Sequence, residues 1–142
     1  MKGWYSMSEN ELDEITHKII GCAFKVSNSL GCGFLEKVYE NALAHEMVKT
    51  GLDVRQQCPL QVFYDGIIVG DYAVDLLVEG KVFVELKAVR QMDEIMMAQC
   101  MNYLRASLLS ICLLINFGRP RLEVRRIIPH QSWKSQPRVL SS

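Results

Sequence analysis

The chain has 142 residues, which is room for one domain with a packed core. Hydrophobic residues make up 49% of it and charged residues 23%, so the composition excludes an intrinsically disordered chain. Its 16 basic side chains balance its 16 acidic ones, which argues against a polycation that coats nucleic acid through net charge alone.

Two amphipathic helices are predicted at the start of the chain. Residues 1–8 are expected to form a loose leader, and from Asn10 to Leu30 apolar residues recur at steps of three and four. Gly31-Cys32-Gly33 ends this helix, because glycine readily adopts the left-handed conformation of a helix end. A second apolar stripe runs from Phe34 to Thr50 and predicts the second helix.

The pattern then changes to that of β-strands. A short polar segment at Val54–Gln57 is broken by Cys58-Pro59. Four strands in two hairpins follow, because Asp65-Gly66 is a favoured pair for a two-residue turn and Gly80 marks a second turn. These strands are expected at Leu60–Tyr64, Ile67–Val69, Tyr72–Val78 and Lys81–Ala88.

A helix and two strands complete the domain. The helix is expected from Asp93 to about Ala106, a strand buried on both faces from Leu108 to Asn116, and the last strand from Leu122 to Ile128. The order ααββββαββ predicts a single α/β domain without repeats, at residues 9–128. Residues 129–142 are polar, and we expect a flexible tail there.

The second hairpin carries the most informative side chains. Successive side chains of a strand point to opposite faces, so the aliphatic residues of both strands fall on one face. When the two aliphatic faces cover one core, Asp75, Glu85 and Lys87 come together on the opposite side. The aliphatic set consists of Val74, Leu76, Val78, Val82, Val84 and Leu86.

The length of the hairpin loop decides whether the two carboxylates share a face. A two-residue loop at Glu79-Gly80 would put Asp75 and Glu85 on opposite faces of the pair. We therefore predict a three-residue loop or a bulge at Gly80. Asp75 then lies directly across from Glu85 or one diagonal step away, with about 4.5 to 8 Å between Cβ atoms.

Two carboxylates and an ammonium on one face suit phosphodiester hydrolysis. A hard cation such as Mg²⁺ is held by one or two carboxylates, with waters completing its coordination. A lysine on the same face can orient or deprotonate a water, or neutralise a phosphate. A surface salt-bridge cluster of Asp75, Glu85 and Lys87 on a solvated sheet face is the alternative interpretation, and the spacing alone leaves both open.

The same residues resemble a known superfamily. Asp75 followed by Glu85-Leu86-Lys87 is similar to the core motif of the PD-(D/E)XK nucleases. In the helix before it, Gly33-Phe-Leu-Glu36-Lys-Val-Tyr39 resembles the motif that names the GxxExxY protein family, a branch of that superfamily. The resemblance extends from about Glu11 to Ile128 and implies a restriction-endonuclease-like fold, a mixed central sheet flanked by helices.

The resemblance also implies roles for particular residues. Asp75 and Glu85 would hold Mg²⁺ or Mn²⁺, with the Leu86 carbonyl as a further ligand, and Lys87 would assist the attacking water. Glu36 resembles the additional acidic residue of the superfamily that completes the metal shell. Glu36 is equally compatible with a carboxylate that merely stabilises the N-terminus of its helix.

Two further groups of residues are predicted to contact the substrate. Gln99 and Tyr103 lie four residues apart on one helix face and resemble a Gln-x-x-x-Tyr element that is directed at the active site or the nucleic-acid backbone. A half-buried tyrosine that packs on the sheet is the alternative for Tyr103. The basic residues Arg119, Arg121 and Arg125 are suited to holding phosphates, with an exposed, solvated edge strand as the alternative.

The charge distribution supports a polyanionic partner. Residues 1–94 carry nine basic and fifteen acidic side chains, whereas residues 95–142 carry seven basic and one acidic. A basic face of this kind can approach nucleic acid, although charges can also segregate on an ordinary solvated surface.

These observations predict a metal-dependent nuclease that acts on nucleic acid, with DNA as the expected substrate. The alternative is a catalytically inactive nuclease fold that serves as a nucleic-acid-binding or protein-interaction module. The sequence shows no membrane segment and no export signal, so a cytoplasmic location is expected. A homodimer is compatible with the resemblance, but no residue indicates it.

Overall fold

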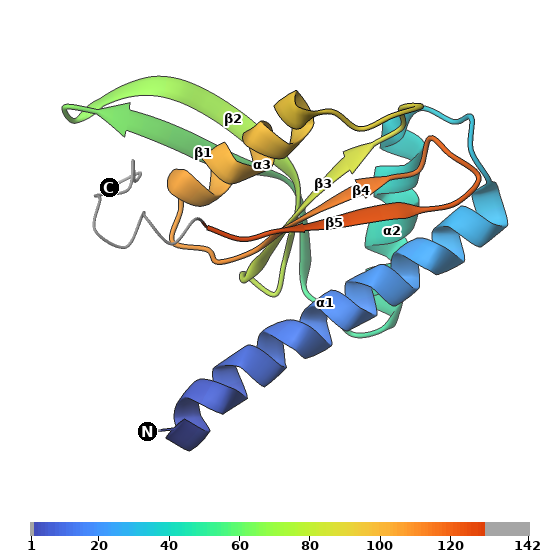
Figure 1. The fold of residues 1–142 in the computed structure, drawn as a ribbon, viewed down its shortest axis with the longest axis horizontal. Coiled ribbons are helices and arrows are strands. Elements are labelled where there is room, and N and C mark those ends of the chain that lie inside the picture. Colours follow the sequence, from blue (N-terminus) through green and yellow to red (C-terminus); the bar gives the residue numbers. More distant parts are fainter. Residues whose placement is uncertain (1, 130–142) are drawn as a thin grey trace.

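The computed structural model describes residues 2–129, which form a five-stranded sheet with helices on both faces (Figure 1). The strand order is β1-β2-β3-β4-β5, with β3 and β4 parallel and the other neighbours antiparallel. The predicted α/β fold with a mixed sheet is therefore confirmed. The elements in chain order are α1 (Lys2–Leu30), α2 (Glu36–Lys49), β1 (Val54–Tyr64), β2 (Ile67–Val78), β3 (Val82–Lys87), α3 (Glu94–Arg105), β4 (Cys112–Asn116) and β5 (Glu123–Ile127).

The core lies in two layers, one on each face of the sheet. Helices α1 and α2 pack on one face through residues such as Ile19 and Leu43. Helix α3 packs on the other face, where Leu104 contacts the side chains of β3 and β4. Every residue of β4 is buried, because both faces of this strand are covered.

The structure corrects the predicted number of strands. Strand β1 runs through Cys58-Pro59 without a break, and β2 continues through the segment between Val69 and Tyr72. Proline is tolerated because β1 is an edge strand, where a missing N–H removes no bond to a further strand. The register shifts by one residue between Val62 and Phe63, which leaves Val69 of β2 as the extra residue of a β-bulge. The element order is therefore ααβββαββ rather than ααββββαββ.

Both predicted hairpin turns are confirmed. Asp65 and Gly66 have φ angles of 52° and 76°, as a two-residue type I′ turn requires. Glu79, Gly80 and Lys81 form a three-residue loop, because Val78 pairs with Val82 across it. Glu79 and Gly80 both have positive φ angles, of 56° and 64°.

The ends of several elements differ from the predicted ones. Helix α1 begins at Lys2, so it extends through residues 2–8, where a loose leader was expected. Strand β4 begins at Cys112 rather than at Leu108. Beyond residue 129 the predicted tail lies outside the described residues. None of the helices within residues 2–129 combines the length and the hydropathy that crossing a bilayer requires.

Candidate active site

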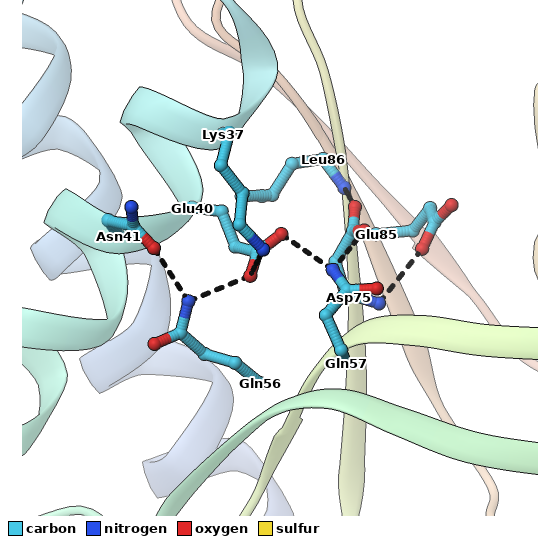
Figure 2. Close-up of polar contacts among 8 residues, drawn as sticks. All are labelled: Lys37, Glu40, Asn41, Gln56, Gln57, Asp75, Glu85 and Leu86. Atoms are coloured by element: carbon cyan, nitrogen blue, oxygen red, sulfur yellow. Dashed lines mark hydrogen bonds and ion pairs between the residues drawn. The ribbon is translucent and has the colours of Figure 1, made fainter.

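The candidate site lies where β2 separates from β3. The two strands pair only where residues Leu76–Val78 of β2 face β3. On the N-terminal side of Leu76, backbone N–H groups bond to carboxylate side chains of the opposite strand instead of to its backbone. The Leu86 N–H donates to Asp75 Oδ2 at 2.8 Å, and the Asp75 N–H donates to Glu85 Oε1 at 3.3 Å (Figure 2). Asp75 and Glu85 are thus each held by the backbone of the opposite strand.

This fork interrupts the alternation of side chains along β2. Leu76 and Val78 contribute to the core under α1 and α2, whereas Val74 packs in the core under α3. The sequence predicts all three on one face, and this part of the prediction is wrong. Asp75 lies between Val74 and Leu76, where β2 changes orientation. Its side chain points toward β3 and accepts a hydrogen bond from the Leu86 N–H.

Glu85 lies in the core under α3 rather than on a solvated sheet face. Only 5% of its surface is exposed, so the surface salt-bridge interpretation does not describe it. Tyr103 of α3 donates its hydroxyl to Glu85 Oε2 at 3.4 Å, and its ring packs edge-on against Phe83. Burial, and next the negative charge of Asp75, raise the pKa of Glu85 to about 7.

The pKa of Asp75 is also raised, with burial as the largest cause. The hydrogen bond from the Leu86 N–H opposes this effect, and the charge of Glu40 adds to it. Both carboxyl groups at the fork therefore hold their protons more tightly than an exposed carboxyl group does.

Lys87 connects this carboxylate pair to α3. Its Nζ lies 3.9 Å from Glu85 Oε2 and donates to Gln99 Oε1 at 3.3 Å. Gln99 and Tyr103 project from one face of α3, which Asp93 caps by accepting a hydrogen bond from the Met96 N–H at 2.9 Å. The structure thus brings Asp75, Glu85, Lys87, Gln99 and Tyr103 together, as the sequence predicts.

Glu36 lies close to this group at the start of α2. Its side chain is exposed, and its pKa is raised first by partial burial and further by the charges of Asp75 and Glu40. The nearby ammonium of Lys87 opposes the rise. Glu36 is therefore near enough to the fork to respond electrostatically to Asp75 and Lys87.

Tyr39 sets the position at which α2 begins. Its hydroxyl donates to the Gly31 carbonyl at 2.6 Å and accepts from the Phe34 N–H at 3.2 Å. Its ring is fully buried and stacks on Phe117 at 4.7 Å between centroids. Gly33 takes a φ angle of 117° in the turn that Tyr39 closes, so the Gly-x-x-Glu-x-x-Tyr motif places Glu36 through this turn.

Sequence reasoning missed Glu40. Its side chain is only 3% exposed, and Oε2 accepts hydrogen bonds from Lys37 at 2.9 Å and from Gln56 at 2.7 Å. Gln57 connects Glu40 to the fork, because its amide donates both to Glu40 Oε1 and to Asp75 Oδ1 (Figure 2). The available signal was spacing, since Glu40 follows Glu36 by four residues on one helix face.

The predicted arginines divide into two groups. Arg119 and Arg121 lie in the loop after β4, and because β3 and β4 are parallel this loop is on the same side of the sheet as the carboxyl end of β3. Arg119 forms an ion pair with Glu123 at 3.9 Å. Arg125 occupies the same row of the sheet as Glu85, two strands away across Leu114, which is about 10 Å. All three are exposed on the described part of the chain.

Comparison with known proteins identifies one family. The model of the PD-(D/E)XK nuclease superfamily matches residues 13–127, which include every residue of the fork and of α3. No match to the chain was found among curated proteins or among solved structures.

Proposed function

The chain belongs to the PD-(D/E)XK nuclease superfamily, and we propose that it hydrolyses phosphodiester bonds of nucleic acid, with DNA as the substrate and Mg²⁺ or Mn²⁺ as the cofactor. The observation that carries the proposal is the fork between β2 and β3, where Asp75 and Glu85 are held by each other's strands beside Lys87. The segment from Gly33 to Tyr39 supports membership of the GxxExxY branch.

The donor groups at the fork fit a hard divalent cation. Within residues 2–129 no group of three or more His, Cys, Asp or Glu side chains is arranged to hold a metal ion. Mg²⁺ needs fewer, because it is commonly bound by one or two carboxylates and keeps several waters. Asp75 and Glu85 would supply these carboxylates, and Glu36 would contribute to the outer part of the shell.

The Leu86 carbonyl is the remaining oxygen donor. The Lys87 carbonyl accepts from the Phe117 N–H on the β4 side, so the neighbouring residue Leu86 directs its backbone groups to the β2 side. Asp75 accepts from the Leu86 N–H on that same side. A divalent cation bound at the fork would lower the pKa of a bound water and neutralise charge on a phosphate.

The protein's own groups would position the reactants. Lys87 can donate to a nonbridging phosphate oxygen or to the attacking water, and Gln99 holds its ammonium at 3.3 Å. Tyr103 fixes the carboxylate of Glu85 through the hydroxyl hydrogen bond. Arg119, Arg121 and Arg125 would bind backbone phosphates on either side of the cleaved bond.

One observation favours the alternative of an inactive binding module. All four carboxylate oxygens of Asp75 and Glu85 lie near hydrogen-bond donors of the protein: the Leu86 N–H, the Gln57 amide, the Asp75 N–H and the Tyr103 hydroxyl. A network that is satisfied in this way can serve stability alone. A metal-binding measurement separates the two functions.

The experiment compares cleavage of single- and double-stranded DNA in Mg²⁺ or Mn²⁺ by the wild type, Asp75→Asn and Lys87→Ala. Asp71→Asn is a matched control on the same strand, and Lys81→Ala is a matched control on the same hairpin. We expect the two site variants to lose cleavage and the two controls to retain it. The cation should also raise the melting temperature of the wild type but not that of Asp75→Asn.

Cleavage that persists in Lys87→Ala would indicate a contaminating nuclease or a different site. A melting temperature that neither cation changes at millimolar concentration, together with no cleavage, would support the binding module instead.

A further inference from the structure

A cavity of about 690 Å³ adjoins the candidate active site on the α3 side of the fork. It lies between α3 and the ribbon formed by β1 and β2, and Lys87, Gln99 and Tyr103 line it as well as the site. The fork explains its origin, since β2 leaves β3 before Leu76 while α3 remains packed on β3 and β4. The volume is in the range of cavities that bind molecules of nucleotide size.

The walls of the cavity are apolar and aromatic. Leu60 and Val62 of β1 and Met96 of α3 form the apolar part, and Tyr72 of β2 borders the cavity with half of its surface exposed. The Tyr72 ring meets the Tyr103 ring edge-on, with 6.3 Å between centroids. A planar, polarisable ligand suits these surfaces better than a hydrated ion does.

Gly70 leaves room for the Tyr72 ring. A Cβ atom at Gly70 would lie 2.9 Å from Tyr72 Cε2 and 3.4 Å from Val62 Cβ, so the ring occupies the space that a side chain would take. Tyr72 pairs with Leu60 and Gly70 with Val62 across the ribbon, which puts all four on the cavity side. The Tyr72 ring thus lies over Gly70 and offers an aromatic surface to the cavity.

Polar and charged side chains also line the cavity, and besides Lys87 and Gln99 they are Asp93, Asn102 and Arg105. Lys87 belongs to the part shared with the active site, and the Asn102 amide on α3 offers both a donor and an acceptor. We propose, on the basis of the proposed nuclease function, that this cavity binds an unpaired nucleobase next to the cleaved phosphate, so that the substrate is single-stranded nucleic acid or an unpaired end. The base stacks on Tyr72, Asn102 contacts its edge, and the adjoining phosphate reaches Lys87.

A base-paired duplex does not fit this arrangement without distortion. Its bases are stacked inside the helix, and extruding one of them costs a few kcal/mol. A single strand presents its bases without that cost, and stacking of a base on an aromatic side chain strengthens binding.

The test measures the binding of fluorescein-labelled oligo(dT) of about twelve nucleotides, a length within the range that small single-strand-binding folds cover. A duplex of equal length is the comparison, and no divalent cation is added, so that the strand is not cut. The variants are Tyr72→Ala and Tyr72→Phe, with Tyr64→Ala as the matched control. Tyr64 lies on the same ribbon and is 69% exposed, but it does not line the cavity.

We expect the single strand to bind more tightly than the duplex. Tyr72→Ala should weaken its binding fivefold or more, since one stacked base is worth at least about 1 kcal/mol. Tyr72→Phe should retain the affinity, and Tyr64→Ala should change it less than twofold. Equal affinity for the duplex, or equal losses in Tyr72→Ala and Tyr64→Ala, would overturn the inference.

The outcomes separate this inference from the proposed function. Binding of single strands that depends on Tyr72, without cleavage in Mg²⁺ or Mn²⁺, supports the cavity and refutes the nuclease. Cleavage of duplex DNA that depends on Asp75 but not on Tyr72 supports the nuclease and refutes the cavity.

Discussion

Replacing Glu85 by glutamine should stabilise the metal-free protein at alkaline pH. Glutamine has nearly the shape of glutamate and preserves both hydrogen bonds at this position. Its carbonyl oxygen can accept from the Asp75 N–H, and its amide can donate to the Tyr103 hydroxyl, which then acts as the acceptor. The substitution therefore removes the buried charge while both polar atoms of the new side chain keep a hydrogen-bond partner.

The pKa of Glu85 gives the size and the sign of the effect. Folding raises this pKa from 4.5 to about 7, and each pKa unit is worth about 1.4 kcal/mol, so ionised Glu85 costs the folded state on the order of 3 kcal/mol. Below pH 4.5 the carboxyl is protonated in both states and costs nothing. Between pH 4.5 and 7 the unfolded state ionises first, so stability falls as the pH rises, and above pH 7 the full cost applies.

Urea unfolding in EDTA at pH 5 and pH 8 measures this difference. We expect Glu85→Gln to be more stable than the wild type by less than about 1 kcal/mol at pH 5 and by up to about 3 kcal/mol at pH 8. Glu94→Gln, at an exposed glutamate on α3, controls for the loss of one negative charge. A stability gain that is equal at the two pH values, or larger at pH 5, would refute the argument from burial.

Three further substitutions test the surroundings of the site. Asn116→Leu should destabilise the protein by about 3 kcal/mol or more in urea unfolding, because the buried amide bonds both backbone groups of Val89 and the Gly118 N–H. Gly118→Ala should destabilise it too, with a lower melting temperature, since a Cβ there would lie 2.3 Å from the Val89 backbone. Tyr103→Phe should lower the free energy of unfolding by about 1 kcal/mol at pH 8 and by less at pH 5. At pH 8 the tyrosine hydroxyl donates to the ionised carboxylate of Glu85, and a hydrogen bond to a charged group is the stronger one. Destabilisation by Tyr103→Phe that is greater at pH 5 would contradict this role.

The sequence predicts the register of the second hairpin correctly because this register depends on local features. The loop of Glu79, Gly80 and Lys81 follows from requiring one aliphatic core across two adjacent strands. Once the register is set, Asp75 and Glu85 have to be neighbours, and one hydrogen bond joins them. Helix spacing likewise puts Gln99 and Tyr103 on one face of α3, and in the structure that face meets this hairpin.

Features that depend on distant segments are not predictable in this way. From the sequence, Pro59 predicts that the strand ends. The sheet order shows that β1 is an edge strand, where a proline does not interrupt the pairing. Glu40 is an ordinary helix glutamate in the sequence, and its burial arises only because Gln56 and Gln57 of β1 pack against α2. Val74 changes faces because β2 leaves β3, which a strict period of two residues does not foresee.

The fork between β2 and β3 accounts for both the candidate active site and the cavity beside it. A continuous strand pair would satisfy its backbone with ladder hydrogen bonds and would leave no room between β2 and α3. Separation of the strands frees the Leu86 and Asp75 N–H groups, which then bind carboxylates and so bring two acidic groups into the core. These carboxylates destabilise the metal-free fold when they are ionised. A divalent cation bound at the fork would compensate the charge of these carboxylates. The geometry that weakens the metal-free protein at pH 8 is therefore also the geometry that the proposed metal-dependent hydrolysis needs.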